Sequence, residues 1–387
     1  MYDAIIVGAR AAGSPTAMLL ARKGHRVLLV DRAGFPSDTV STHYIHQPGV
    51  ARLRSWGLLE RVAASGCPAV RETTLDVGPF ALRAPVAPAG DVADAYAPRR
   101  TILDSILLEG AADAGAEVRT GFPVDEILVD DGAVIGIRSG SVVERARVVV
   151  GADGRNSLVA RSVHAPATDA RASRTCVYYS YWTGPRSDAA ELYPREGRMI
   201  ISGPTNDGLE IVIAYWPVDE FSAVRADLER AFREAVALAP PLMERMAAGE
   251  RADRFYGMAE SPFWIRKPYG PGWALVGDAG YHKDPITAQG ITDAFRDAEL
   301  LADALDAGFR GERSLDDALA DYEQARDEAV RPLYELTWEF AALAPPAPEQ
   351  QALFAALRDD PERTSQFLGT VAGTVSIEEF FAALVQA

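Results

Sequence analysis

The sequence predicts an α/β (α+β) fold: a Rossmann-like nucleotide-binding domain in discontinuous segments, a second domain with a mixed β-sheet, and a helical C-terminal region. Three observations predict it. Residues 4–31 have the pattern of a buried strand, a glycine-rich turn, a helix and a second strand. Apolar strands over 147–150 and 273–276 each lead into a turn that pairs glycine with aspartate. Beyond residue 315 the chain is strongly helical in character.

The first segment contains the parts of a dinucleotide site. The strand over 4–7 leads into Gly8-Ala9-Arg10-Ala11-Ala12-Gly13. Gly8 permits a tight turn, and Gly13 lets the following helix pack close to the strand, so that the helix N-terminus offers N–H groups to a pyrophosphate. Asp31, which Arg32 follows, ends the second strand and can accept hydrogen bonds from the adenosine ribose.

Arg10 occupies the position where the dinucleotide fingerprint has its second glycine. A side chain there limits how closely the backbone approaches the pyrophosphate, but a guanidinium group matches the geometry of phosphate oxygens. We therefore expect Arg10 and Ala12 to lie at the phosphates. This segment does not separate FAD from NAD.

Two later segments favour FAD. Gly151-Ala152-Asp153-Gly154 follows one apolar strand, and an ordinary Asp-Gly turn before a helix is an equal alternative for it. Gly277-Asp278-Ala279 follows another strand, and an aspartate there can reach the hydroxyls of a ribityl chain. Pro285, Gln289 and Gly290 come next, and an amphipathic helix begins there. The three segments, in this order in one chain, predict an FAD site.

Together the segments resemble the glycine-rich, Asp-Gly and Gly-Asp motifs of the FAD-dependent monooxygenases related to para-hydroxybenzoate hydroxylase. Geranylgeranyl reductases and flavin-dependent halogenases belong to the same superfamily. The resemblance covers about residues 1–306. It implies that Gly8, Gly13 and Asp31 hold the ADP half of FAD and that Arg100 (or the adjacent Arg99) lies near the flavin or its phosphates. It also implies that Asp153 and Gly154 lie at a cleft through which NAD(P)H passes and that Gly277 and Asp278 bind ribityl or ribose hydroxyls. Along the isoalloxazine it places Pro285, Gln289, Gly290 and Ile291.

Three residues are candidates for catalysis. His43 belongs to a stretch that passes near flavin and substrate in the resembled family, and a purely structural role is its alternative. His282 and Lys283 lie between the Gly-Asp motif and Pro285, where a cation can tune the flavin or guide a hydride donor; a solvated loop is the alternative. Aromatic residues of the second domain are expected to line a substrate pocket: Tyr179, Tyr181 and Trp216.

The domain prediction divides the chain into three parts. The FAD-binding domain takes residues 1–76, 99–170 and 261–315, the substrate domain takes 77–98 and 171–260, and the helical region takes 316–387. A proline-rich break is expected at 344–348, and Ser376-Ile377-Glu378-Glu379 predicts a capping box before a last helix.

Composition excludes several classes of function. A net charge of −16 argues against nucleic-acid and anionic-membrane binding. Two cysteines are too few for a disulfide framework, and five histidines without ligand spacing predict no metal site. No apolar run reaches membrane-spanning length, and the chain starts almost directly with its first strand, so we expect a cytoplasmic protein.

The predicted function is an FAD-dependent monooxygenase. NAD(P)H is the expected transient reductant, and a flavin C4a-hydroperoxide transfers one oxygen of O₂ to a small aromatic or alkene-containing substrate, by hydroxylation or epoxidation. A separate flavin reductase is an alternative partner. The alternative functions are a reductase of isoprenoid double bonds, a halogenase, and a non-catalytic flavin-binding protein. The Trp-x-Trp-x-Ile-Pro motif of family halogenases does not occur.

Overall fold

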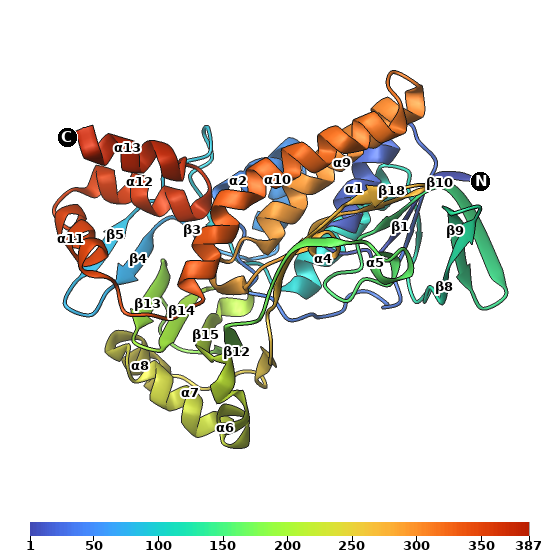
Figure 1. Ribbon diagram of the computed structural model, residues 1–387. Coiled ribbons are helices and arrows are strands. Elements are labelled where there is room, and N and C mark those ends of the chain that lie inside the picture. The colour runs from blue at the N-terminus through green and yellow to red at the C-terminus, as the bar shows by residue number, and fades with distance from the viewer. Residues whose placement is uncertain (387) are drawn as a thin grey trace.

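The computed structural model describes residues 1–386, in which three bodies of secondary structure lie side by side (Figure 1). The strands are β1 (Tyr2–Val7), β2 (Val27–Val30), β3 (Ala69–Val70), β4 (Thr73–Asp76), β5 (Ala81–Ala84), β6 (Ala95–Tyr96), β7 (Glu117–Arg119), β8 (Glu126–Asp130), β9 (Ala133–Ser139), β10 (Val142–Gly151), β11 (Ala167–Arg171), β12 (Thr175–Trp182), β13 (Ala190–Arg195), β14 (Arg198–Pro204), β15 (Glu210–Pro217), β16 (Tyr256–Met258), β17 (Phe263–Arg266), β18 (Tyr269–Gly270), β19 (Trp273–Leu275) and β20 (Tyr281–His282).

Helices account for most of the remaining ordered elements, with short 3₁₀ turns between some of them. The helices are α1 (Gly13–Arg22), α2 (Gln47–Ser55), α3 (Leu59–Ala64), α4 (Arg100–Asp113), α5 (Leu158–Ser162), α6 (Phe221–Ala226), α7 (Leu228–Val236), α8 (Pro240–Ala247), α9 (Gly290–Arg310), α10 (Leu315–Phe340), α11 (Pro348–Leu357), α12 (Pro361–Ala372) and α13 (Ile377–Gln386). The 3₁₀ turns are η1 (Asn206–Gly208), η2 (Val218–Glu220), η3 (Gly277–Ala279) and η4 (Pro285–Thr287).

The first domain is built on a mostly parallel sheet in the order β18-β19-β10-β1-β2-β7, with the β8–β9 hairpin attached to β10. Both faces of its centre are covered, which explains why these strands are apolar without alternation. Ile6 faces a core shared with α1, α4 and α9, whereas Ile5 faces α5 and the β8–β9 hairpin. The predicted Rossmann-like arrangement of these segments is confirmed.

The second domain is a seven-stranded mixed sheet in the order β16-β12-β15-β14-β13-β4-β5. Its residues alternate between two faces, as the period of a strand requires. One face packs against α6–α8, at the lower edge of Figure 1, and the other faces η4 and the end of α10. The sheet begins earlier than predicted: β4 pairs with β5 and β13, so residues 73–76 belong to the second domain and not to the first.

Two pairs of consecutive helices are separated at single residues. α2 and α3 are separated at Gly57, whose φ of +73° no continuous helix can contain. α6 and α7 are separated at Asp227, whose carboxylate accepts a hydrogen bond from the Arg230 N–H and so caps α7.

The C-terminal region, predicted over 316–387 and described up to residue 386, covers both domains. α10 runs beside α9 on the first domain (Figure 1). α11–α13 pack instead against β5 of the second sheet, with Leu82 and Phe367 in their common core. The predicted break at 344–348 is confirmed, and the Ser376 hydroxyl accepts a hydrogen bond from the Glu379 N–H at 3.3 Å.

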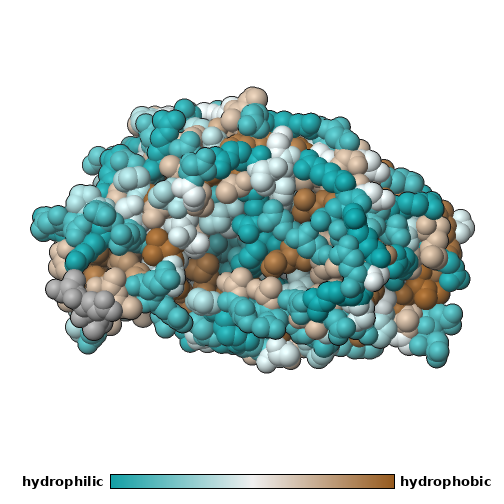
Figure 2. All heavy atoms as spheres, turned by 90° about the horizontal axis from the view of Figure 1, so that it is seen from above, coloured by the Kyte–Doolittle hydropathy of each residue, from teal (hydrophilic) through white to brown (hydrophobic). Residues whose placement is uncertain are grey.

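The face of the molecule seen in Figure 2 is mainly hydrophilic. Hydrophobic residues lie on it in small separate groups. None of the helices within residues 1–386 is both long and apolar enough to cross a membrane. Over the same residues no group of three or more histidine, cysteine or acidic side chains is placed to hold a metal ion.

Candidate active site

The glycine-rich turn after β1 leaves no room for a side chain at its two glycines, Gly8 and Gly13. Gly8 has a φ of +105°, and a Cβ on it would lie 2.4 Å from the Ala152 carbonyl oxygen. A Cβ on Gly13 would lie 1.8 Å from the Gly8 carbonyl oxygen. Helix α1 starts at this turn without a side-chain cap. Pro15 has no N–H and the Ser14 N–H donates to the Arg10 carbonyl oxygen at 3.0 Å, so among the described residues only the Gly13 N–H of the first turn is left for a ligand. The turn therefore has the form expected for holding a pyrophosphate.

Asp31 lies at the end of β2, beside this turn. One carboxylate oxygen accepts a hydrogen bond from the Ala9 N–H, and the other accepts one from the Ala33 N–H, both at 2.8 Å. These bonds fix the carboxylate at the edge of the sheet where an adenosine ribose is expected. Arg32 beside it is exposed.

Arg10 has a different environment from the one that its predicted role requires. Its guanidinium donates to Asp104 at 2.6 Å and to the Ser37 hydroxyl at 2.6 Å. Asp104 is fully buried and also accepts two hydrogen bonds from Arg100, four residues earlier in α4. The two predicted phosphate ligands, Arg10 and Arg100, thus share one buried carboxylate. In this arrangement they join the glycine-rich turn, the loop at Ser37 and α4.

Asp153 and Gly154 follow β10 as predicted, but Asp153 has a local structural role. One of its oxygens accepts hydrogen bonds from the Leu158 N–H at 2.6 Å and the Val159 N–H at 3.4 Å, at the start of α5. The other oxygen is buried and has no partner among the described residues. Burial raises the pKa of Asp153, although these N–H groups oppose the rise. Gly154 has a φ of +74° and open space at its Cβ position.

The third segment places a polar group and a helix start side by side. Gly277 has a φ of +61°, and its missing Cβ would lie 2.9 Å from the Ala12 Cβ, so η3 packs against the start of α1. Asp278 beside it is exposed. Helix α9 begins at the exposed Gly290 without a side-chain cap, and no atom lies within 4 Å of the Cβ position of Gly290. A negatively charged ring edge would be stabilised at this helix start.

The turn η4 precedes α9 and is held by several elements. Pro285 is its first residue. The His46 Nε2 donates to the Thr287 carbonyl oxygen at 3.1 Å, and the Thr287 and Thr337 hydroxyl oxygens are 2.8 Å apart. The Gln289 amide, predicted to lie along the isoalloxazine, donates instead to the Val371 carbonyl oxygen of α12 at 2.5 Å. Ile291 follows in the first turn of α9 and is buried.

His43 is buried and strained. Its φ is +63°, a region that residues with side chains rarely adopt. Its Nε2 lies 2.5 Å from the Tyr181 hydroxyl, and its Nδ1 is buried with no partner among the described residues. Burial, and then the nearby guanidinium groups of Arg100 and Arg99, lower the pKa of His43 to about 3. The ring is therefore neutral at pH 7.

His282 and Lys283, the other two candidates for catalysis, are engaged within the protein. The His282 Nδ1 donates to the Pro262 carbonyl oxygen at 2.5 Å, and its ring stacks on Trp264. The Lys283 ammonium pairs with Asp293 of α9 at 2.5 Å, and both side chains are at least 95% buried. Burial raises the pKa of Asp293, but Lys283 and Arg296 outweigh it and lower that pKa to about 2. The alternative of a solvated loop is therefore wrong, because Lys283 is buried in an ion pair.

None of the three predicted pocket aromatics is among the residues that line the cavity between the second sheet, η4 and the C-terminal helices, and only two of them share a face of the sheet. Tyr179 and Tyr181 of β12 point to the side of the sheet that carries His43 and Ile286. Trp216 points to the opposite side, where it packs with Phe232 of α7. The prediction for Trp216 is wrong, because β12 and β15 are antiparallel neighbours in which Trp216 pairs with Cys176, one residue out of phase with the two tyrosines.

Sequence analysis missed Asp284, a buried acid at the same turn. One of its oxygens accepts a hydrogen bond from the Thr175 hydroxyl at 2.5 Å, and the other caps η4 through the Ile286 N–H at 3.0 Å. Burial raises the pKa of Asp284 to about 7, although both hydrogen bonds oppose the rise. An aspartate directly before a proline that opens a helical turn was the available signal.

A large cavity opens between the second sheet, η4 and the C-terminal helices. Its volume is about 1240 Å³, and apolar side chains form most of its lining. The part nearest to α9 is lined by residues of β14, β15, η4 and the loop before α2: Thr42, Tyr44, His46, Met199, Ile201, Ser202, Ile211, Ile213, Ile286, Thr287 and Ala288.

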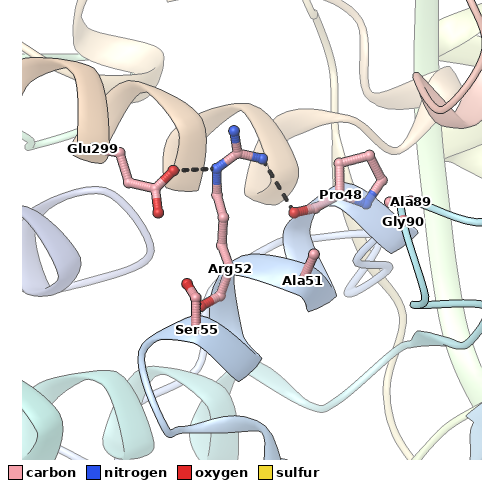
Figure 3. A pocket seen from close by; sticks show the side chains of 7 residues that line it. All are labelled: Pro48, Ala51, Arg52, Ser55, Ala89, Gly90 and Glu299. Atoms are coloured by element: carbon pink, nitrogen blue, oxygen red, sulfur yellow. Dashed lines mark hydrogen bonds and ion pairs between the residues drawn. The ribbon is translucent and has the colours of Figure 1, made fainter.

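A second hollow is shallow and lies between α2, the loop at Gly90 and α9 (Figure 3). Arg52 crosses it, donating to the Glu299 carboxylate at 2.7 Å and to the Pro48 carbonyl oxygen at 3.1 Å. Because its charged groups satisfy one another, this hollow fixes α2 to α9 and does not form a second candidate site.

Comparison with known proteins identifies the family. The family described as FAD binding domain matches residues 1–337. The chain belongs to this family. Membership confirms the predicted superfamily, the FAD-binding fold and the class of FAD-dependent oxidoreductases.

Relatives of this family differ in what they do. The chain is 26% identical over 326 residues to 1H-pyrrole-2-carbonyl-(peptidyl-carrier protein) brominase of Pseudoalteromonas luteoviolacea, a match that spans 80% of this chain and 78% of the relative. It is 35% identical over 179 residues to protein FixC of Salmonella typhi, and this match spans 42% of this chain and 39% of FixC.

Solved structures share the fold over the whole length. Flavin-dependent brominase Bmp2 has a TM-score of 0.84 at 18% identity, and the match covers 100% of this chain and 98% of Bmp2. PqsL of Pseudomonas aeruginosa, described as a probable FAD-dependent monooxygenase, has a TM-score of 0.73 at 23% identity, covering 100% of both chains. At these identities the likeness shows the fold and not the reaction.

Gly8→Ala should abolish FAD retention. Both the positive φ and the close approach of Ala152 oppose a side chain at Gly8. Gly24→Ala is the matched control, because Gly24 has a similar φ of +90° but nothing within 4 Å of its Cβ position. We expect purified Gly8→Ala to carry little FAD per chain, measured by flavin absorbance after gel filtration, and Gly24→Ala to carry as much as the unaltered protein. Equal FAD content in the two variants would contradict the assignment of this turn.

Asp284→Asn should stabilise the protein at alkaline pH. The pKa of Asp284 is raised, so the folded state binds a proton that the unfolded state releases, and stability is lost as pH rises from about 4 through about 7. Asparagine keeps the oxygen that caps η4 and does not ionise. We expect a higher melting temperature than the unaltered protein at pH 8 and little difference at pH 4, with about 1.4 kcal/mol for each unit of pKa difference.

The exposed Asp359→Asn is the control for this experiment and should match the unaltered protein at both pH values. Lower stability of Asp284→Asn at pH 8 would show that the ionised carboxylate is the stabilising form.

Proposed function

We propose that this protein is an FAD-dependent monooxygenase that uses NAD(P)H and O₂ to oxidise an organic substrate held in the large cavity. The observation that supports it is the position of η4. Ile286, Thr287 and Ala288 form one wall of the cavity, and two residues later Gly290 begins the helix at which the flavin ring is expected. Substrate and flavin would then lie on the two sides of one turn.

The residues that would hold FAD are the glycine-rich turn and Asp31 for its ADP half, and Asp278 with the start of α9 for its ribityl chain and ring. Bound there, FAD supplies the electron transfer and oxygen activation that protein side chains lack. The protein's own contribution is orientation and the exclusion of water by an apolar cavity. The buried Asp104, shared by Arg10 and Arg100, keeps the glycine-rich turn and α4 in register.

His43 would supply a hydrogen bond to the reacting groups. If the Tyr181 hydroxyl donates to the His43 Nε2, the proton of the neutral ring resides on Nδ1, which has no other partner among the described residues. A strained, buried and neutral histidine is a costly arrangement for a purely structural residue. It is reasonable for a group that donates a hydrogen bond to a bound ligand.

NAD(P)H is proposed as a transient reductant that enters without a domain of its own, because the sequence contains one glycine-rich dinucleotide segment. A separate flavin reductase is the alternative source of electrons. Mixing the purified protein with NADH or NADPH distinguishes the two, because direct reduction of the flavin needs no second protein.

The test is substrate-stimulated oxidation of NADH and NADPH by the FAD-loaded protein under ¹⁸O₂, across phenols, indoles and alkenes, with products analysed by mass spectrometry. We expect at least one compound to gain one ¹⁸O atom. His43→Ala should lower the rate of product formation about 100-fold with FAD content unchanged. Reduction of the substrate without oxygen incorporation would replace the proposal with a double-bond reductase, and stimulation by no compound would favour a flavin-binding protein.

Bromination is a second candidate, favoured by the brominase relative that matches 80% of this chain. The missing Trp-x-Trp-x-Ile-Pro motif argues against it. Adding bromide to the same reactions decides between the two: a product with the two-isotope pattern of bromine supports halogenation, whereas an ¹⁸O-labelled product in the presence of bromide supports the monooxygenase.

A further inference from the structure

The large cavity is bordered by two separate hydrophobic cores. At η4 it meets the core that contains Ile211, Ile213 and Ile286. At α11 and α13 it meets the core that contains Leu353, Phe354 and Leu384. The cavity therefore extends from the turn beside the expected flavin to the C-terminal helices, and it is apolar at both ends.

Six charged side chains lie on the cavity wall: Arg195, Arg198 and Glu335 form ion pairs within the protein, Glu339 and Glu349 are exposed, and Arg174 stacks on an aromatic ring. Arg195 pairs with Asp76 at 2.8 Å, and Arg198 pairs with Glu220 at 2.7 Å. Arg174 lies over the Trp338 ring, 3.6 Å from its centroid, and donates to the Trp338 carbonyl oxygen. A charged ligand would have to compete with these contacts, so the lining favours an uncharged one.

Hydrogen bonds tie the wall near α12 to the turn near the flavin. Gln289 donates to Val371 of α12, and Thr287 bonds Thr337 of α10. The C-terminal helices are thus joined to the same short segment that opens α9. A ligand that spans the cavity would contact elements whose relative positions are already set.

The volume decides which ligand fits. Sites for small molecules usually measure about 300–1,000 Å³, and this cavity measures about 1240 Å³. A single aromatic ring would leave most of the apolar wall without a partner, and unfilled apolar surface forgoes dispersion contacts. A longer molecule is needed to use both hydrophobic ends.

We propose that the substrate is an elongated, uncharged, apolar molecule whose reacting end lies at Thr287 and whose apolar chain extends under α11 and α13. This inference rests on the proposed function for the meaning of the reacting end, whereas the position of the chain rests on the cavity alone. Leu353 and Leu384 would then determine which chain lengths are accepted.

The test is binding of a series of 4-alkylphenols, from ethyl to nonyl, to the FAD-loaded protein by isothermal titration calorimetry below their aggregation concentrations. A buried methylene contributes about 0.8 kcal/mol, which is about a fourfold decrease in Kd for each added carbon. We expect this decrease to continue along the series. An affinity that stops rising after the first few carbons overturns the proposal.

Leu353→Trp locates the chain. Leu353 lines the cavity from α11, and Ala355 on the same helix is exposed and does not line it, so Ala355→Trp is the matched control. We expect Leu353→Trp to bind ethylphenol as the unaltered protein does and to lose at least tenfold in affinity for nonylphenol, and Ala355→Trp to change neither. If Leu353→Trp and Ala355→Trp behave alike, the chain does not lie under α11. Should Leu353→Trp fail to fold, Leu384→Trp on α13 tests the same end.

Binding requires no turnover, so the two proposals fail separately. Chain-length-dependent binding without oxygen incorporation would remove the monooxygenase and leave the ligand class in place. Oxygen incorporation with an affinity that is independent of chain length would do the reverse.

Discussion

The fold depends on how η4 is held, because all three parts of the molecule meet at this turn. The first domain holds it through His46, the second sheet through Thr175 and Asp284, and the C-terminal region through Thr337. Ala288, which ends the turn, has a φ of +54°, a conformation that a side chain adopts only where surrounding contacts enforce it. Hydrogen bonds from all three parts of the molecule fix the position of this turn, and the turn thereby positions the start of α9 relative to the cavity.

Buried charge beneath the turn serves the same purpose. Lys283, Asp293 and Arg296 form a chain of ion pairs with almost no solvent contact, and Arg296 also binds Asp297. Burying such groups costs desolvation that their attraction only partly offsets, so a cluster like this adds little net stability. Its effect is geometric: removing one member would leave the others uncompensated, so β20 and α9 have one permitted register. The depressed pKa of Asp293 is the electrostatic result of that arrangement.

Much of the fold was predictable from local pattern. Glycine at positions 8 and 13, aspartate at 31 and the Gly277-Asp278 pair are local features, and the structure places them around one site. Long-range pairing was not predictable in the same way. β4 contains Thr73 and Thr74 and carries no mark of its pairing with β13, which comes more than a hundred residues later. The prediction that Trp216 lines a substrate pocket was wrong because strand register decides which face a residue occupies, and aromatic content does not reveal register.

Polar partners were harder to predict than elements. Arg100 and Asp104 are four residues apart in a helix, a spacing that predicts a pair, but nothing in the sequence indicates that Arg10 joins them. Lys283 has an acidic neighbour at Asp284, yet its partner is Asp293, because η4 turns the chain between the two.

The same family fold supports different reactions, so the reaction must be determined by what lies around the flavin and not by what holds it. In this chain the cofactor-holding features are glycines, backbone N–H groups and single carboxylates, which are indifferent to substrate. The feature that can discriminate is on the far side of η4: a cavity whose wall comes from four separate stretches of sequence, 42–97, 174–213, 286–288 and 332–384. Because α11–α13 complete that wall and are bound to Gln289 at the start of α9, substitutions in the C-terminal region can alter specificity without touching a cofactor contact.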